Sequence, residues 1–211
     1  MDRDTIIRLF KHLQAENPEP KTELNYSSPF ELLVAVMLSA QSTDIGVNKA
    51  MFQLFPVANT PQAILEMGES RLKKHISTLG LYNSKTKHLL STCRILVDQY
   101  RGEVPDNRSA LESLPGVGRK TANVLLNILF DKPTIAVDTH IFRVGNRTGL
   151  APGKTPLEVE KRLLKVIPQQ FKMHAHHWLI LHGRYTCKAR KPLCHQCPIE
   201  NECGWPEKPT A

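Results

Sequence analysis

Four cysteines are crowded into the C-terminal segment and constrain how that segment can fold. Cys187, Cys194, Cys197 and Cys203 lie within 17 residues at the spacing C-x6-C-x2-C-x5-C, so their four thiolates can converge on one point. Tetrahedral zinc and a [4Fe–4S] cluster both accept four thiolates. A zinc ribbon usually has two C-x2-C pairs and this segment has one, which favours the cluster. Two disulfides are a third alternative, disfavoured because the polar N-terminus lacks a secretion signal.

The loop between the first two of these cysteines is rich in cations. It carries Lys188, Arg190 and Lys191. A basic loop that is held at both ends is suited to binding phosphate, and solvated surface charge is the alternative.

Signals for helix starts recur along the rest of the chain. Residues 28–31 (SPFE) read as N-cap, N1 proline and capping-box glutamate. The apolar residues of the predicted helix that follows are Leu32, Leu33, Val36, Met37 and Ala40. Residues 155–158 (TPLE) repeat the signal and open a helix that should stop near Pro168.

A further helix is predicted between Asn83 and Gly102, with Gly102 at the C′ position and Cys93 in the core. Alternating β-branched runs are nearly absent, and the longest extended candidate is residues 134–137 (TIAV). The fold class is therefore predicted to be all-α.

The charge of the chain favours a polyanionic partner. Twenty-eight Lys and Arg against 20 Asp and Glu give a formal charge of +8 and a pI near 9.3, which makes nucleic acid the first candidate. The longest apolar stretch, residues 30–40, is shorter than the roughly 20 residues that span a bilayer. We expect no membrane span and a cytoplasmic location.

Residues 114–122 (LPGVGRKTA) lie between two predicted helices, residues 106–113 and 119–130. Glycines let a phosphate approach backbone N–H groups, and the N-terminus of the following helix attracts anions. A P-loop is excluded, because Arg119 separates Gly118 from Lys120 and no strand precedes the turn. This helix, tight turn and helix can grip a DNA backbone without reading its sequence, and an ordinary glycine turn is the alternative.

These residues resemble the helix-hairpin-helix of the bacterial endonuclease III family of DNA glycosylases and AP lyases. Further matching segments are residues 38–44 (LSAQSTD), 80–85 (GLYNSK), 137–144 (VDTHIFRV) and the cysteine spacing. The resemblance extends from about Pro18 to Cys203 and implies two helical domains with a DNA-binding cleft between them. The implied domains are residues 22–132, with six helices and the hairpin, and residues 1–21 plus 133–211, with the [4Fe–4S] cluster on the four cysteines.

The resemblance also implies the site residues. Lys120 would be the nucleophile and Asp138 its carboxylate partner. The implied DNA contacts are Gln41 and Leu81, which would fill the gap left by a flipped base, Gly116, Gly118 and Arg119 of the hairpin, His140, and Lys191 of the cysteine loop. The partner would be double-stranded DNA with a damaged base or an abasic site, bound by a monomer.

The chemistry of the residues supports these implied roles. A lysine amine is almost entirely protonated at neutral pH, so it attacks only where its surroundings favour the neutral form. Partial burial, Arg119 and a helix N-terminus would do so at Lys120. The reaction that the resemblance implies is removal of an oxidised pyrimidine through a Schiff base, followed by β-elimination that nicks the strand 3′ to the abasic site. Asp138 would support the charge that develops on the sugar, and it also reads as an N-cap for the next helix.

Three other functions remain as alternatives. The related adenine mismatch glycosylase shares the hairpin and the cluster, but lysine at position 120 argues against it. A non-catalytic DNA-binding module with a structural cluster would lose little on substitution of Lys120. A ferredoxin-like electron carrier would have little use for the +8 charge or the hairpin.

Overall fold

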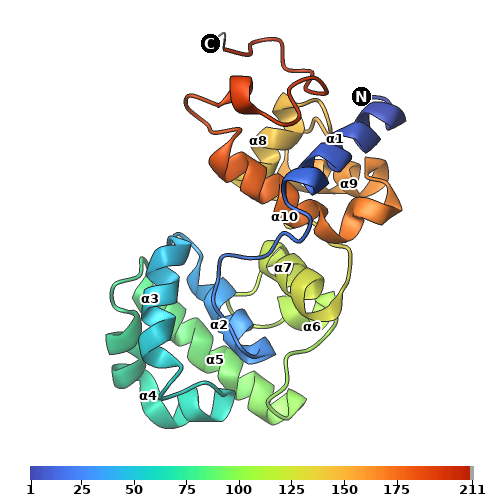
Figure 1. The fold of residues 1–211 in the computed structure, drawn as a ribbon. Coiled ribbons are helices and arrows are strands. Elements are labelled where there is room, and N and C mark those ends of the chain that lie inside the picture. The colour runs from blue at the N-terminus through green and yellow to red at the C-terminus, as the bar shows by residue number, and fades with distance from the viewer. Residues whose placement is uncertain (210–211) are drawn as a thin grey trace. The chain divides into compact units, whose positions relative to one another are not determined.

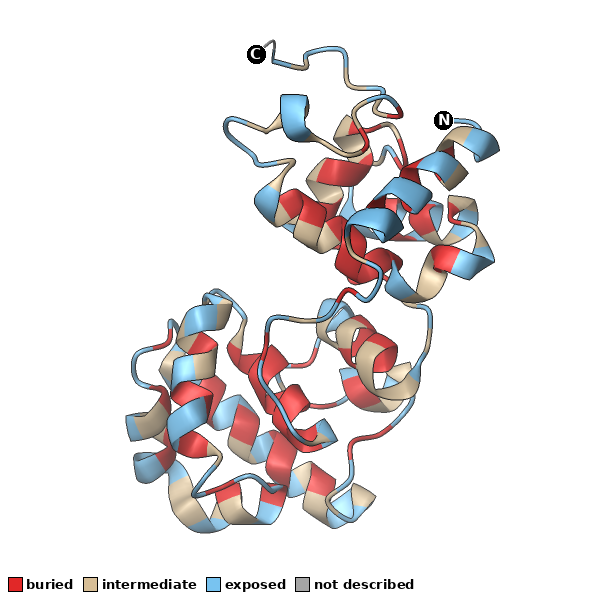
Figure 2. Ribbon diagram, viewed as in Figure 1, coloured by how far each residue is buried: buried red, intermediate tan, exposed pale blue. Residues whose placement is uncertain are grey.

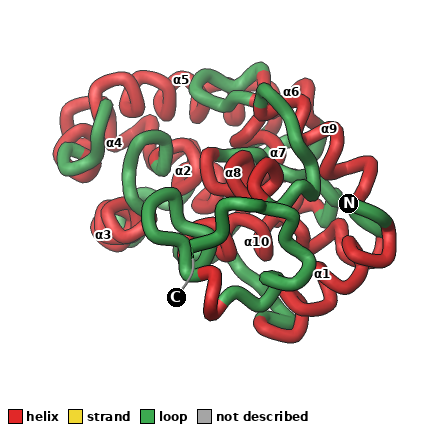
Figure 3. Tube along the Cα trace, turned by 90° about the horizontal axis from the view of Figure 1, so that it is seen from above, coloured by secondary structure: helices red, strands yellow, loops and turns green. Residues whose placement is uncertain are grey.

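Ten α-helices and one short 3-10 helix, with no strand, make up the secondary structure of residues 1–209, the part of the chain that the computed structural model describes (Figure 3). The all-α prediction is confirmed. The chain divides into two units by its internal contacts: Met1–Lys21 with Asp131–Ala211, called unit 1, and Thr22–Phe130, called unit 2. Each unit has its own core of buried side chains (Figure 2).

Unit 2 is built from six helices within the described residues (Figure 1). They are α2 (Pro29–Leu38), α3 (Asp44–Leu54), α4 (Pro61–Ile76), α5 (Tyr82–Tyr100), α6 (Arg108–Glu112) and α7 (Arg119–Phe130). Nine of the ten residues of α2 are buried, so it is the central helix of the unit, as its apolar sequence indicates. α4 packs along α5, and α7 packs against both α2 and α6. Cys93 is fully buried in this core, as predicted.

The start of α2 follows the predicted signal with one change of partner. Ser28 Oγ accepts a hydrogen bond from the N–H of Glu31, but the Glu31 carboxylate accepts from the N–H of Ser27, one residue before the N-cap. The helix ends at Leu38, so the expected inclusion of Ala40 is wrong, and Ala40 is exposed. The Ser39 hydroxyl donates to the carbonyl of Val36 and closes the helix before it can reach Ala40.

Two other helix boundaries follow from local hydrogen bonds. α5 ends at Tyr100, and Gly102 donates its N–H to the carbonyl of Leu96 at 2.8 Å, which confirms it as the C′ residue. The helix expected over residues 106–113 covers only Arg108–Glu112. Asn107 is the reason, because its side chain accepts from the N–H of Ala110 and makes Asn107 the N-cap.

Unit 1 contains both ends of the chain. Its helices are α1 (Arg3–Glu16), α8 (Thr139–Arg147), α9 (Pro156–Val166), α10 (Gln169–Tyr185) and the 3-10 helix η1 (Cys194–Gln196). Phe10 of α1 stacks on Phe171 of α10 with ring centroids 5.5 Å apart, and the Trp178 indole N–H donates to the carbonyl of Asn17 at 2.7 Å. Aromatic packing therefore holds the N-terminal helix against α10.

α9 begins and ends close to where the sequence predicts, and it packs closely on α8. Thr155 caps α9 as predicted, and α9 stops at Val166, two residues before Pro168. A Cβ added at Gly145 of α8 would lie 3.2 Å from a methyl of Val159 in α9. Gly145 thus marks a close helix–helix contact, which accounts for a glycine inside a helix.

Candidate active site

The glycine hairpin joins α6 to α7 in unit 2. Gly116 has φ +82°, a left-handed conformation that glycine adopts without strain. Val117 is buried and donates its N–H to the carbonyl of Leu114 at 3.0 Å. A Cβ added at Gly118 would meet nothing within 4 Å. Gly118 therefore borders open space at the point where α7 begins, as an approach to phosphate requires.

α5 braces the hairpin through two residues that the sequence did not single out. A Cβ added at Gly116 would lie 3.0 Å from both Cβ and Nδ1 of His88, and the Thr92 hydroxyl donates to the carbonyl of Pro115 at 3.0 Å. His88 and Thr92 are one helical turn apart, so they present one face of α5 to the turn. Their separation in sequence from the hairpin leaves no local signal that would have revealed them.

Lys120 lies in the first turn of α7, two residues after Gly118. Its side chain is exposed, so the partial burial expected from the sequence is not observed. Two features of its predicted surroundings remain, the neighbouring Arg119 and the N-terminus of α7. The amine is accessible to a large substrate.

Asp138 lies in unit 1 and begins α8. One carboxylate oxygen, Oδ1, accepts hydrogen bonds from the N–H groups of His140 at 2.9 Å and Ile141 at 2.8 Å. The predicted N-cap role is confirmed. Within residues 1–209 no protein hydrogen bond involves the second oxygen, Oδ2. The half-buried carboxylate is therefore held in one orientation by Oδ1 while Oδ2 stays available.

His140, the next predicted site residue, is fixed by contacts with α10. A Cβ added at Gly183 would lie 2.8 Å from the Cβ of His140, so α8 and α10 approach closely at this point. The Arg143 guanidinium lies 3.3 Å from His140 Nδ1 and donates to the carbonyls of Gly183 and Cys187 at 2.7 and 2.9 Å. Gly183 and Arg143 were not predicted, because their importance lies in contacts about 40 residues apart in sequence.

Gln41 and Leu81 are both exposed residues in left-handed backbone conformations. Their φ angles are 53° and 59°. For a residue with a Cβ this conformation costs about 1–2 kcal/mol, so the surrounding structure must hold it. Gln41 lies in the turn between α2 and α3, and Leu81, which precedes α5, is 56% exposed. A large apolar side chain that extends into solvent at this position suits insertion into a base stack.

The four C-terminal cysteines line one cavity in unit 1, together with Thr148, His182 and Trp205 among others. Backbone hydrogen bonds shape the segment around it. Cys187 donates its N–H to His182 and Leu193 to Thr186, and Cys197 donates to Cys194. Among residues 1–209 no three His, Cys, Asp or Glu side chains are placed to hold a single metal ion. The four thiols instead stand around the shared cavity.

The four thiols lie close enough to affect one another's ionisation. Burial raises the pKa of Cys197 to about 11, and the negative charges of the other three cysteines add to the effect. Burial, followed by repulsion from Cys187 and Cys203, also raises the pKa of Cys194. Such mutual repulsion between thiolates is relieved when iron binds them. The donor set present therefore fits an iron–sulfur cluster.

The basic loop after Cys187 is attached to α8. Arg147 donates to the carbonyls of Lys188 and Ala189, and its guanidinium also stacks over the ring of Trp205, 4.4 Å from the centroid. Lys191 is exposed, with φ 52°. The loop is thus held at its base while its cations face solvent.

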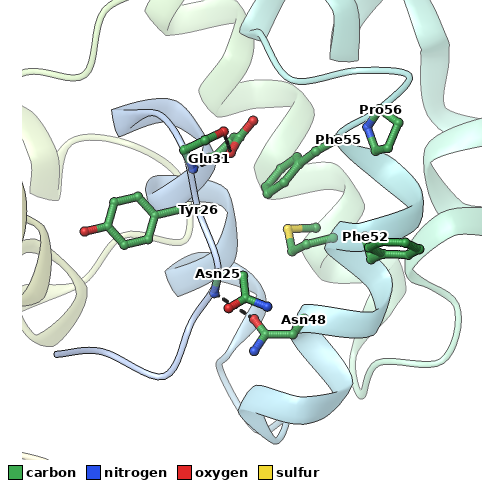
Figure 4. A pocket seen from close by; sticks show the side chains of 9 residues that line it. Asn25, Tyr26, Glu31, Asn48, Phe52, Phe55 and Pro56 are labelled. Carbon is green, nitrogen blue, oxygen red and sulfur yellow. Dashed lines mark hydrogen bonds between the residues drawn. The ribbon is translucent and has the colours of Figure 1, made fainter.

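A hollow of about 450 Å³ lies beside α2 and α3 in unit 2 (Figure 4), and no predicted site residue lines it. Asn48 accepts from the N–H of Asn25 at 2.9 Å and donates to the carbonyl of Glu23 at 2.8 Å. The Glu31 carboxylate in the same hollow accepts hydrogen bonds from the N–H and the hydroxyl of Ser27. These polar groups serve to attach the chain that leads into α2.

No helix within the described residues has the length and apolar character needed to cross a membrane.

Comparison with known proteins places this arrangement in a family. Residues 34–169 match the HhH-GPD superfamily of base excision DNA repair proteins, and residues 187–203 match the iron–sulfur binding domain of endonuclease III. The chain is 61% identical over 208 residues to endonuclease III of Escherichia coli (strain K12), covering 99% of both chains. The protein of the same name from Haemophilus influenzae is also 61% identical over 208 residues, with the same coverage.

Solved structures agree with the sequence relatives. A trapped endonuclease III–DNA covalent intermediate is similar with a TM-score of 0.90 and 42% identity, covering 97% of this chain and 96% of that one. A non-covalent endonuclease III–DNA complex gives the same values. The chain belongs to the endonuclease III family of helix-hairpin-helix, iron–sulfur DNA glycosylases and AP lyases of base excision repair.

Proposed function

We propose that this chain removes oxidised pyrimidines from double-stranded DNA and then cleaves the resulting abasic site, with Lys120 as nucleophile. The observation that carries the proposal is the exposed Lys120 in the first turn of α7. It follows a glycine turn in which Gly118 borders open space that a phosphate could enter. The 61% identity with endonuclease III over the whole chain supports the same reaction class.

The bond changes follow from a primary amine attacking a sugar. The neutral Nζ of Lys120 bonds to C1′ of the flipped nucleotide, and the glycosidic bond to the damaged base breaks. The sugar ring then opens and leaves a protonated imine between Lys120 and C1′. Loss of a proton from C2′ expels the 3′ phosphate, which is β-elimination, and hydrolysis of the imine frees Lys120.

Asp138 is proposed to stabilise the positive charge on the sugar while the base leaves. Its Oδ1 is held by two N–H groups at the start of α8, so the carboxylate does not have to be ordered during the reaction.

The remaining predicted site residues are proposed to bind DNA. Gln41 and Leu81 would fill the gap in the base stack, which offsets the few kcal/mol that flipping requires. Gly116, Gly118 and Arg119 would contact phosphates at the hairpin. His140 and Lys191 would contact the backbone from unit 1. Because its substrate is chromosomal DNA, the enzyme is proposed to act at the nucleoid in the bacterial cytoplasm.

Cys187, Cys194, Cys197 and Cys203 are proposed to hold the [4Fe–4S] cluster of the family. When bound, the cluster supplies metal–thiolate bonds that cross-link residues 187–203. The chain's own contribution is to present the basic loop: Arg147 holds its first residues by their carbonyls.

Borohydride trapping tests the nucleophile. The cluster-loaded protein is incubated with a duplex that contains one abasic site, and borohydride reduces any imine to a stable protein–DNA adduct. We expect an adduct with the wild type and with Lys11→Ala, an exposed lysine on α1 that serves as the matched control. We expect none with Lys120→Ala.

A folded wild type that gives no adduct would refute the lyase mechanism. Base removal without strand cleavage would then indicate a monofunctional enzyme such as the adenine glycosylase relative, and binding alone would indicate a non-catalytic module. An adduct that persists in Lys120→Ala would move the nucleophile to another amine.

A further inference from the structure

Lys85 is the one lysine among residues 1–209 that is buried, with 6% of its surface exposed. It lies in the first turn of α5, and its Nζ donates a hydrogen bond to the Ser42 hydroxyl at 2.8 Å. No carboxylate within the described residues forms an ion pair with it. Burial lowers the pKa of Lys85. A buried ammonium group in a protein is normally paired with a carboxylate, so this environment calls for an explanation.

Packing alone does not provide that explanation. A methionine or leucine would fill the same volume without the cost of removing an ammonium group from water. What lysine adds is a donor that reaches from α5 to a hydroxyl 43 positions away in the sequence. The function of the residue should therefore lie in what that hydrogen bond joins.

The hydrogen bond joins the two loops that carry Gln41 and Leu81. Ser42 is the chain neighbour of Gln41, and its N–H donates to the carbonyl of Ser39 at 3.0 Å. Lys85 lies one helical turn after Leu81 and donates its own N–H to the Leu81 carbonyl at 3.0 Å. The link thus connects the backbone next to one residue with the first turn that follows the other.

The same two loops also touch through their backbones. A Cβ added at Gly80 would lie 3.1 Å from the carbonyl oxygen of Gln41, which is tighter than nine in ten real Cβ contacts. Leu81 is the N-cap residue of α5 and offers no side-chain cap to the helix, and both Gln41 and Leu81 have positive φ. Their conformations therefore depend on contacts between the loops more than on local sequence.

We propose that Lys85 is a positioning residue that holds the Gln41 loop (residues 39–43) and the Leu81 loop (residues 79–82) in one fixed geometry through Ser42. The inference rests on the proposed roles of Gln41 and Leu81 in filling the gap left by a flipped base. Two residues that enter a base stack from different loops must be correctly spaced before they meet DNA. A preformed spacing avoids the cost of ordering the loops during binding.

The test compares Lys85→Met, Ser42→Ala and Lys87→Met in the full, cluster-loaded protein. Lys85→Met keeps the buried volume and removes the donor, and Ser42→Ala removes the acceptor and leaves Lys85 in place. Lys87→Met is the matched control, because it removes an exposed lysine from the same helix.

Single-turnover base removal is measured on a duplex with one thymine glycol. We expect Lys85→Met to slow it by about tenfold or more. Ser42→Ala should slow it in the same direction, and Lys87→Met should change it less than about twofold.

A double-mutant cycle separates positioning from a direct contact with DNA. In a background with Gln41→Ala and Leu81→Ala, the loops carry nothing to position, so Lys85→Met should have no further effect. Full additivity of the effects would overturn the proposal. A uniform loss of affinity with a salt slope smaller by about one would overturn it as well, because it would identify Lys85 as a phosphate contact.

Amide hydrogen exchange gives a readout that does not depend on activity. Exchange over residues 39–43 and 79–82 should become faster in Lys85→Met and in Ser42→Ala, and stay unchanged in Lys87→Met. Unchanged exchange in both of the first two variants would refute the link between the loops. A wild type that removes no base would refute the proposed function instead, and the exchange result would still decide whether Lys85 orders the loops.

Discussion

Asp138 accepts two amide N–H groups at the start of α8 and, in the proposed mechanism, faces the charge that develops on the sugar. The structural role and the chemical role draw on different atoms, because both hydrogen bonds end on Oδ1. A single carboxylate can therefore cap the helix and act in the site. The two roles can be separated by substitution.

Asp138→Asn should abolish most of the activity and leave the fold intact. Asparagine is as good an N-cap as aspartate, so the melting temperature should change little, whereas base removal should slow by at least about a hundredfold without the negative charge. Asp138→Ala is the comparison variant, because it should lose the charge together with about 1 kcal/mol of capping. Single-turnover rates and thermal melts check both variants. Near-normal base removal by Asp138→Asn would show that the carboxylate charge is not used.

At the scale of elements, the hairpin and α8 are each held by a helix distant in sequence. His88 and Thr92 of α5 contact the hairpin, and Gly183 allows α10 to lie close against His140 of α8. A turn that is supported in this way keeps its N–H groups in place for a phosphate. The two glycines of the hairpin should therefore respond differently to substitution.

Gly116→Ala should lower stability, and Gly118→Ala should lower DNA affinity. Alanine at Gly116 would adopt a positive φ at a cost of about 1–2 kcal/mol and would press on His88, so the melting temperature should fall by several degrees. Alanine at Gly118 meets no protein atom within 4 Å. Its melting temperature should match that of the wild type, while Kd for an abasic duplex should rise by about tenfold if a phosphate approaches there.

Each hairpin variant serves as the control for the other. Fluorescence anisotropy with a labelled duplex and thermal melts give both quantities. A Gly118→Ala protein that binds DNA as tightly as the wild type would show that phosphate does not come close to the hairpin backbone at this residue.

At the scale of the whole molecule, the stability of unit 1 should depend on pH through His177. Burial, aided by the nearby His174, lowers the pKa of His177 from its ordinary value of 6.5 to about 4. The folded state therefore favours the neutral ring, and the unfolded chain binds a proton first as the pH falls. Stability from this group is complete above pH 6.5 and is lost progressively down to about pH 4.

Unfolding measured between pH 7 and pH 4 should show this loss, which amounts to about 3 kcal/mol once the pH is below both pKa values. His177→Leu places an apolar side chain that cannot titrate at the same position. The stability of this variant should therefore fall less over the same pH range. The difference between the two proteins isolates His177 from the other acid-sensitive groups. Parallel curves for wild type and variant would show that His177 titrates normally.

Features that depend on a few neighbouring residues could be predicted from the sequence. The starts of α2 and α9 follow from N-cap and proline signals whose hydrogen bonds close within four residues. The hairpin, the N-cap role of Asp138 and the burial of Cys93 also follow from short patterns. The boundaries at Ala40 and Asp106 were wrong because Ser39 and Asn107 make competing local hydrogen bonds that end or delay a helix.

Contacts between distant segments were beyond the reach of local patterns. His88 beside Gly116, Gly183 beside His140, and Lys85 bonded to Ser42 each join residues 28 to 43 positions apart. No periodicity or short motif encodes such a pair, since each partner is ordinary in its own neighbourhood. Hydrogen bonds and caps within a helical turn are properties of the chain, whereas the geometry of the hairpin and of the Gln41 and Leu81 loops arises only when separate helices pack together.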